Sequence, residues 1–135
     1  MRWVFADTVY WIALANPLDQ WHQLAVRARR TLRGTTIVTS EEVLTEFLAH
    51  FSGQGRMIRE GAVRYAQRVL TNPDITVRPQ THQTFLDGFA LYKARLDKDY
   101  SLTDCISMEA MRQEGITDIL THDNHFTHEG FTILL

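Results

Sequence analysis

Short apolar segments alternate with longer amphipathic segments along nearly the whole chain, and this alternation is the strongest constraint on its fold. Segments such as 2–6 and 36–38 are short and rich in β-branched or aromatic residues, which favours strands. Longer segments such as 56–70 place apolar residues on one face at helical spacing. Strands and helices in this order predict right-handed crossovers and a mainly parallel sheet. We therefore expect an α/β fold, a single-domain α/β/α sandwich over residues 1–135.

The boundaries of the predicted elements come from helix caps, glycine stops and turn residues. Asp19 is expected to cap the second helix, and two pairs, Thr39 with Glu42 and Ser101 with Asp104, have capping-box spacing. The expected strands cover residues 2–6, 36–38, 75–77, 118–121 and 131–134, and the expected helices, caps included, cover 8–15, 19–33, 39–51, 56–70, 81–96 and 101–114.

Four acidic residues fall where this topology would bring them to one edge of the sheet. Asp7 and Asp123 come just after predicted strands, Glu46 lies about two turns into a helix, and Asp104 lies in the first turn of another. Ligands of open parallel sheets bind beyond the carboxyl ends of the strands. Each acid alone has an ordinary explanation as a cap or a solvated residue, but their convergence is hard to explain by capping alone.

Clustered carboxylates indicate a divalent cation. A carboxylate close to a core is costly unless a positive charge compensates it, and hard cations such as Mg²⁺ prefer oxygen ligands. Two such cations about 3.5–4 Å apart can lower the pKa of a water and stabilise a leaving oxygen. The acidic set therefore suits the hydrolysis of phosphodiester bonds.

The overall charge gives no general attraction to a polyanion, because the net charge is −2 and the isoelectric point is about 6.3. Local positive charge must therefore guide a nucleic acid. The chain has 12 arginines and two lysines, and arginine suits fork-shaped recognition of phosphate or carboxylate. Arg56, Arg59, Arg64 and Arg68 lie off the apolar face of one predicted helix. They are candidate contacts for RNA or an acidic partner, and simple solvation is the alternative.

The remaining composition favours an ordinary cytoplasmic protein. The single cysteine, Cys105, excludes an intramolecular disulfide framework and fits a reducing compartment. No apolar run approaches the roughly 20 residues that span a bilayer. The N-terminal segment also lacks the pattern of a signal peptide. We therefore expect no membrane association.

Order and spacing link several of these segments to a known family. The segments that carry the resemblance are residues 5–8, 19–25, 39–46, 102–105 and 121–126. Together they resemble the PIN-domain ribonucleases, specifically the VapC-like toxins of bacterial toxin–antitoxin pairs, over essentially all 135 residues. The resemblance implies an endoribonuclease that uses Mg²⁺, for which Mn²⁺ can substitute. It also implies an RNA substrate, a cognate antitoxin and a homodimer.

The resemblance further assigns the four acids and one hydroxyl. It implies that Asp7, Glu46, Asp104 and Asp123 form the catalytic, metal-binding cluster, supported by a hydrogen bond from Thr121.

Three neighbouring residues have less specific expectations. Thr8 would hydrogen-bond near the metals or cap the first helix, and Asn124 would ligate or orient. His125 would contact a substrate phosphate, or make only a local hydrogen bond.

Two other classes of protein compete with a nuclease. One is a non-catalytic PIN-fold module that binds RNA or protein, against which the intact acidic set argues. The other is a phosphate-handling α/β protein. A receiver domain needs a late lysine, but the last one, Lys98, precedes Asp104. A haloacid-type phosphatase needs a second Asp two residues after Asp7, where Val9 stands.

Overall fold

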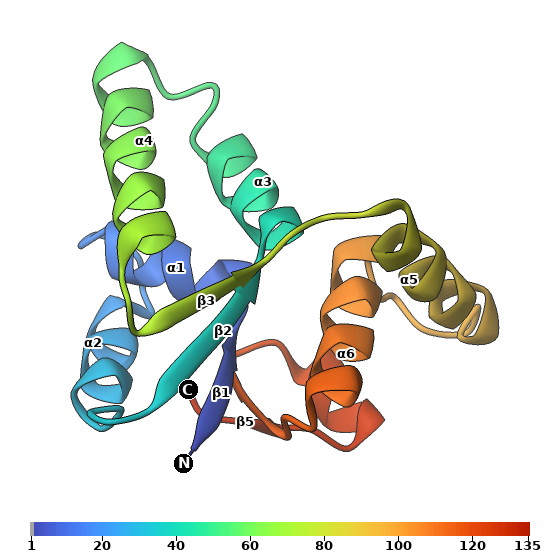
Figure 1. Ribbon diagram of the computed structural model, residues 1–135. Coiled ribbons are helices and arrows are strands. Elements are labelled where there is room, and N and C mark those ends of the chain that lie inside the picture. The colour runs from blue at the N-terminus through green and yellow to red at the C-terminus, as the bar shows by residue number, and fades with distance from the viewer. Residues whose placement is uncertain (1) are drawn as a thin grey trace.

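The computed structural model describes residues 2–135 and contains a five-stranded sheet with helices on both sides (Figure 1). The strand order is β3-β2-β1-β4-β5, and every neighbouring pair is parallel. The strands are β1 (Trp3–Ala6), β2 (Thr36–Ser40), β3 (Ile75–Arg78), β4 (Asp118–Leu120) and β5 (Thr132–Ile133). The expected α/β/α architecture is confirmed.

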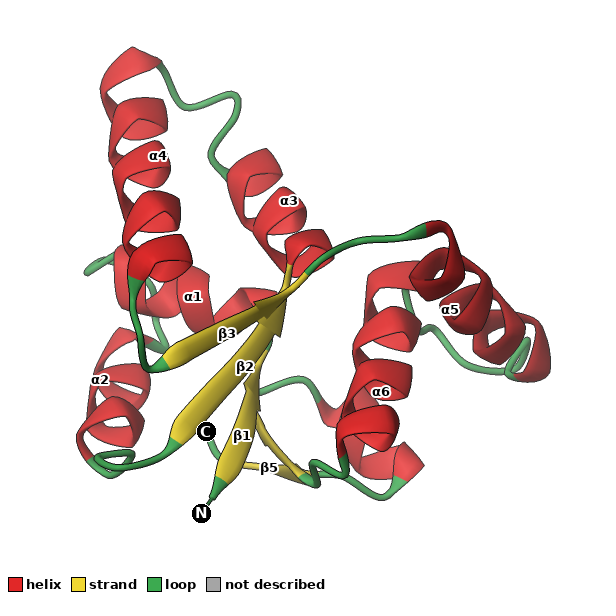
Figure 2. Ribbon diagram, in the orientation of Figure 1, coloured by secondary structure: helices red, strands yellow, loops and turns green. Residues whose placement is uncertain are grey.

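Helices fall on the two sides of the sheet according to their place in the chain. The helices are α1 (Thr8–Ala15), α2 (His22–Arg30), α3 (Glu41–His50), α4 (Arg56–Thr71), α5 (His82–Ala94), α6 (Leu102–Glu114) and the 3₁₀ helix η1 (Asn124–Glu129). Figure 2 shows the first four on one side of the sheet, and α5 with α6 on the other. No helix within residues 2–135 is long and apolar enough to cross a bilayer.

The predicted start of the second helix is wrong. α2 begins at His22, with Trp21 in the N-cap position. Asp19 instead accepts a hydrogen bond on Oδ1 from the backbone N–H of Trp21, at 2.8 Å. Its side chain therefore stabilises the turn that precedes the helix. At the other end, α2 stops at Arg30, three residues before the predicted end.

The predicted capping box of Thr39 and Glu42 is also wrong. Ser40 is the N-cap of α3 and accepts a hydrogen bond from the backbone N–H of Val43, at 3.1 Å. The Thr39 hydroxyl is fully buried and is used in tertiary contacts. It donates to the carbonyl of Ala6 at 2.9 Å and accepts from Nε1 of Trp11 at 3.2 Å.

The capping box of α6 is confirmed. The Ser101 hydroxyl accepts from the backbone N–H of Asp104 at 3.0 Å, and Oδ2 of Asp104 accepts from the backbone N–H of Ser101 at 3.1 Å. Gly115 ends the helix in the left-handed conformation, with φ of 69°. The start of α6 thus fixes one carboxylate oxygen of Asp104.

The 3₁₀ helix η1 is the element that the sequence did not predict. It follows Asp123, whose Oδ1 accepts a hydrogen bond from the backbone N–H of His125, at 2.9 Å. An aspartate that caps the next turn in this way bends the chain directly after β4. η1 then leads through Gly130 to β5.

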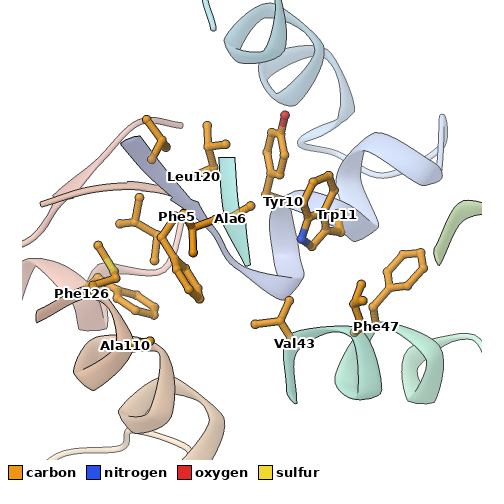
Figure 3. Packing of buried hydrophobic residues seen from close by; sticks show 14 of the residues in the cluster. Phe5, Ala6, Tyr10, Trp11, Val43, Phe47, Ala110, Leu120 and Phe126 are labelled. Atoms are coloured by element: carbon orange, nitrogen blue, oxygen red, sulfur yellow. The ribbon is translucent and has the colours of Figure 1, made fainter. Parts of the chain in front are cut away.

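The core lies on both faces of the central strands. Val4, Phe5 and Ala6 of β1 are all fully buried, as expected for a strand that is covered on both faces. Figure 3 shows Phe5 close to Phe126, and Trp11 above the first turns of α3. The end of β1 is therefore packed on both faces.

Candidate active site

The acidic residues lie near the carboxyl ends of β1 and β4, two neighbouring strands from which the chain continues in opposite directions along the sheet. β1 is paired with β2 on one side and with β4 on the other. The chain leaves β1 and β4 on opposite sides of the sheet, and in open parallel sheets ligands bind at such a point, beyond the carboxyl ends of the strands. We call this region the acidic crevice. Asp7 follows β1 directly, and Thr121 follows β4 directly.

Asp7 is fixed by β4 through both its backbone and its side chain. Its backbone N–H donates to the carbonyl of Leu120 at 3.2 Å, and only 3% of the residue is exposed. The fully buried hydroxyl of Thr121 donates to Oδ2 of Asp7 at 3.0 Å. That hydroxyl also accepts from the backbone N–H of Asp123 at 3.1 Å. Thr121 thus joins the two aspartates through its hydroxyl.

Asp104, Asp123 and His125 form the tightest group of potential ligands among the described residues. One ligand atom from each lies within 4.8 Å of the others. Nδ1 of His125 is 3.4 Å from both Oδ2 of Asp104 and Oδ1 of Asp123. The histidine therefore lies between two carboxylates that come from α6 and the start of η1.

Burial and mutual repulsion oppose the ionisation of the two most enclosed acids. Burial, followed by the nearby charges of Asp104 and Glu46, raises the pKa of Asp7 to about 7. Burial also raises the pKa of Asp104, and the charge of Asp123 adds to this. Carboxyl groups that share a site in this way ionise more readily when a cation is added.

Glu46 approaches the cluster from a third element. It lies on α3 with an exposed side chain, and it is not part of the group of three. Its charge nevertheless contributes to the raised pKa of Asp7. Electrostatic interactions therefore link the four acids at this end of the sheet, and Glu46 is the most exposed of them.

The donor set fits a divalent cation. Carboxylate oxygens from separate elements are the ligands that hard cations such as Mg²⁺ prefer. The hydroxyl of Thr8, beside Asp7, is buried and makes no hydrogen bond within residues 2–135. This hydroxyl is a further oxygen on the residue next to Asp7. The expected alternative, that Thr8 caps the first helix, is wrong, because Asp7 occupies the N-cap position of α1.

The remaining predicted residues are exposed or lie on another helix. Asn124 begins η1 and has an exposed side chain. The four arginines belong to α4, which lies on the opposite side of the sheet from α6 (Figure 1). Arg56 pairs with Glu60 at 2.8 Å, and Nη1 of Arg59 donates to the carbonyl of Ser52 at 2.9 Å.

Three of these four arginines line an open surface hollow. Arg56, Arg59 and Arg64 are among the residues around a cavity of about 660 Å³ at the turn between α3 and α4.

Several residues around the crevice were not predicted. The ring of His122 stacks on Trp21, with centroids 4.2 Å apart and planes 12° from parallel, which fixes the loop that carries Asp123. The ring of Tyr100 lies 5.3 Å from that of His125. Periodicity and capping patterns carry no signal for such contacts, because they join segments that are distant in the chain.

Comparison with known proteins places this crevice in a family. A model of the PIN domain matches residues 4–131. The chain belongs to the PIN domain family. The predicted resemblance to VapC-like PIN proteins is confirmed by a curated relative, the 23S rRNA-specific endonuclease VapC20 of Mycobacterium tuberculosis. This relative is 27% identical over 131 residues, which cover 95% of both chains.

Several solved structures share the fold of this chain. The crystal structure of M. tuberculosis VapC20, described as a sarcin-ricin loop cleaving toxin, superposes with a TM-score of 0.84 at 25% identity over 96% of both chains. VapBC2 from Rickettsia felis, bound to a promoter DNA fragment, gives 0.66 at 13% identity over 97% of this chain and 96% of that one. FitAcB from Neisseria gonorrhoeae gives 0.62 at 12% identity over 98% of this chain and 96% of that one.

Proposed function

We propose that this PIN domain, comprising residues 1–135, is an endoribonuclease that requires Mg²⁺ or Mn²⁺ and hydrolyses RNA phosphodiester bonds. The observation that carries the proposal is the burial of the Asp7 carboxyl beside other acidic residues. Its carboxyl is buried, and the acids of α3 and α6 oppose its ionisation. A cation would relieve both penalties at once, because it compensates the desolvated charge and screens the repulsion.

Each acid has a distinct part in this proposal. Asp7, Asp104 and Asp123 would hold the cation, and Glu46 would complete the set from the exposed side. Bound there, Mg²⁺ or Mn²⁺ would supply a Lewis acid for phosphodiester hydrolysis and lower the pKa of an attacking water. Thr121 would orient the Asp7 carboxylate through its 3.0 Å hydrogen bond.

Neighbouring polar residues would act on the substrate or support the cluster. His125 is half-buried between two carboxylates, where its ring would meet a phosphate oxygen of RNA. Thr8 would add its buried hydroxyl beside Asp7, and Asn124 would contact the substrate from the exposed start of η1.

The partners follow from the similarity to VapC20. That protein is named for 23S rRNA and described as a toxin, so ribosomal RNA is the first substrate to test. A toxin implies a cognate antitoxin, and we propose that one binds this chain and that the chain forms a homodimer. The arginines of α4 would contact either RNA or an acidic segment of the antitoxin. All of these encounters would take place in the cytoplasm.

The experiment removes the charge of one aspartate inside the acidic crevice and, as a control, that of one aspartate outside it. Asp104→Asn removes a carboxylate from the crevice, whereas Asp118→Asn removes one from the opposite end of β4, where it pairs with Arg2 at 3.0 Å. Purified wild type should cleave ribosomal RNA with Mg²⁺ or Mn²⁺ and not with EDTA. Asp104→Asn should lose about 100-fold or more of this activity, and Asp118→Asn should retain it.

The same assay separates the enzyme from a non-catalytic PIN module. A module that only binds RNA would shift RNA in a gel without cleaving it, whatever the cation. Cleavage that persists in EDTA, or in Asp104→Asn, would refute the proposed site.

A further inference from the structure

A buried carboxylate outside the acidic crevice joins three segments of the C-terminal half. The side chain of Glu129, at the end of η1, is only 5% exposed. Its Oε2 accepts from Nε of Arg95 at 3.0 Å and from the hydroxyl of Tyr100 at 3.0 Å. Its Oε1 accepts from Nη2 of Arg112 at 2.8 Å and from Nη2 of Arg95 at 3.3 Å. Burial alone would raise the pKa of Glu129, but these hydrogen bonds hold it below its ordinary value.

The partners of Glu129 come from both ends of the α5–α6 pair. Arg95 is the C-cap residue of α5, and Arg112 lies in the last turn of α6. Tyr100 lies in the loop that joins the two helices. Glu129 therefore sets where η1 lies relative to α6, and these two elements carry Asp123 and Asp104.

Tyr100 connects this network to Asp104. The tyrosine is 4% exposed, and it immediately precedes Ser101, the N-cap of α6. The backbone N–H of Ser101 donates to Oδ2 of Asp104 at 3.1 Å. Any shift of the Tyr100 backbone would therefore move the donor that orients this carboxylate.

The ring of Tyr100 connects the network to Asp123, by way of His125. It lies 5.3 Å from the ring of His125, with the planes tilted by 57°. The backbone N–H of His125 donates to Oδ1 of Asp123 at 2.9 Å, and its Nδ1 lies 3.4 Å from both carboxylates. Tyr100 is thus joined through its backbone to the support of Asp104, and its ring lies beside the support of Asp123.

We propose that Glu129 is a positioning residue, which acts through Tyr100 to fix the separation of the Asp104 and Asp123 carboxylates and so sets the affinity of the crevice for a divalent cation. This inference rests on the proposed function, because it concerns the same crevice. Glu129 itself touches none of the four acids. Groups that orient the ligands of a metal change its affinity about 10–100-fold when they are altered.

Two substitutions test this role, and a third serves as a control. Glu129→Gln keeps the shape but removes the charge, so that it weakens the hydrogen bonds from both arginines. Tyr100→Phe keeps the ring beside His125 and removes only the hydroxyl. The matched control is Glu114→Gln, which breaks the pair with Arg78 at the end of α6 that is remote from Asp104.

Binding of Mn²⁺ alone is measured by calorimetry without RNA, at a temperature well below the melting point of each variant. Cleavage of RNA is measured in parallel as kcat and KM. We expect Glu129→Gln to bind Mn²⁺ about 10-fold more weakly and to lose a similar factor in kcat, with little change in KM. Tyr100→Phe should change in the same direction by a smaller factor, and Glu114→Gln should behave as wild type.

A merely structural role predicts a different result. Glu129→Gln would then melt at a lower temperature but bind Mn²⁺ with wild-type affinity while folded, which would overturn the inference. If Glu129→Gln does not fold, Tyr100→Phe decides, and an unchanged Mn²⁺ affinity and kcat in that variant would overturn it equally. A wild-type protein that neither binds Mn²⁺ nor cleaves RNA would instead refute the proposed function.

Discussion

Replacing Asp7 by Asn should stabilise the cation-free protein while it abolishes RNA cleavage. The substitution keeps the size of the side chain but removes a charge that burial, Asp104 and Glu46 all oppose. The charge destabilises the native state only at a pH at which Asp7 is ionised. The effect on the free energy of unfolding should therefore depend on pH.

The size and sign of the effect follow from the two pKa values of Asp7. Its pKa rises from 3.8 to about 7 on folding, which corresponds to about 4 kcal/mol as an upper limit. Dielectric relaxation around the crevice lowers the expected effect to on the order of 2–4 kcal/mol. The unfolded chain loses this proton near pH 4, whereas the native protein keeps it until about pH 7. The wild type therefore loses stability as the pH rises between these values, and loses no more above them.

Urea unfolding in EDTA, from about pH 4 to about pH 8, measures this effect. The informative quantity is the wild-type free energy of unfolding minus that of Asp7→Asn, because most other titrations cancel in the difference. This difference should become more negative as the pH rises, and Asp118→Asn should show no such trend. Adding Mn²⁺ should stabilise the wild type far more than Asp7→Asn. A difference that stays flat with pH would refute the account of Asp7.

Three further predictions concern the crevice, the packing of the helices and the arginines. Thr121→Val removes the hydroxyl that joins the two strand-end aspartates and should lower kcat about 10-fold or more in the cleavage assay. Gly88→Ala would drive a methyl group into Ile106, so urea unfolding should show a loss of about 1–3 kcal/mol. Replacing Arg59 and Arg64 by Ala should weaken RNA or antitoxin binding at low salt, measured by titration, with the loss shrinking at high salt. Unchanged affinity for both ligands would show that this surface is only solvated.

The strands and the overall architecture could be predicted because their signals are local. Segments such as 36–38 and 118–121 are short and apolar between turn residues, so their type and order follow from neighbours in the chain. The parallel topology then follows from the helices between them. This reasoning also brought Asp7 and Asp123 to one edge of the sheet, where the structure places them.

Caps were predicted correctly only where no tertiary contact competes. Ser101 lies in a loop and is free to cap α6, as expected. Thr39 has the same kind of local signal, but its hydroxyl is taken by Trp11 and the end of β1. The cap moved by one residue to Ser40 as a result. Capping patterns cannot reveal such competition, because the competing groups are distant in sequence.

The supports of the crevice were missed for the same reason. Glu129 and Tyr100 are 29 residues apart, and neither belongs to a recognisable motif. The sequence shows only an acid in a C-terminal turn and an aromatic residue before a helix. Their burial against two arginines becomes visible only when α5, α6 and η1 are packed together.

Asp104 shows why structural and chemical explanations of an acidic residue need not compete. Oδ2 accepts the hydrogen bond that closes the capping box of α6, and the same atom faces Nδ1 of His125. The free N–H groups and the dipole of a helix start favour a negative charge there, which partly offsets the burial that raises the pKa of this carboxyl. The capping box therefore holds the carboxylate of Asp104 close to those of Asp7 and Asp123. The local role holds the side chain still, and a fixed carboxylate is what a cation site requires.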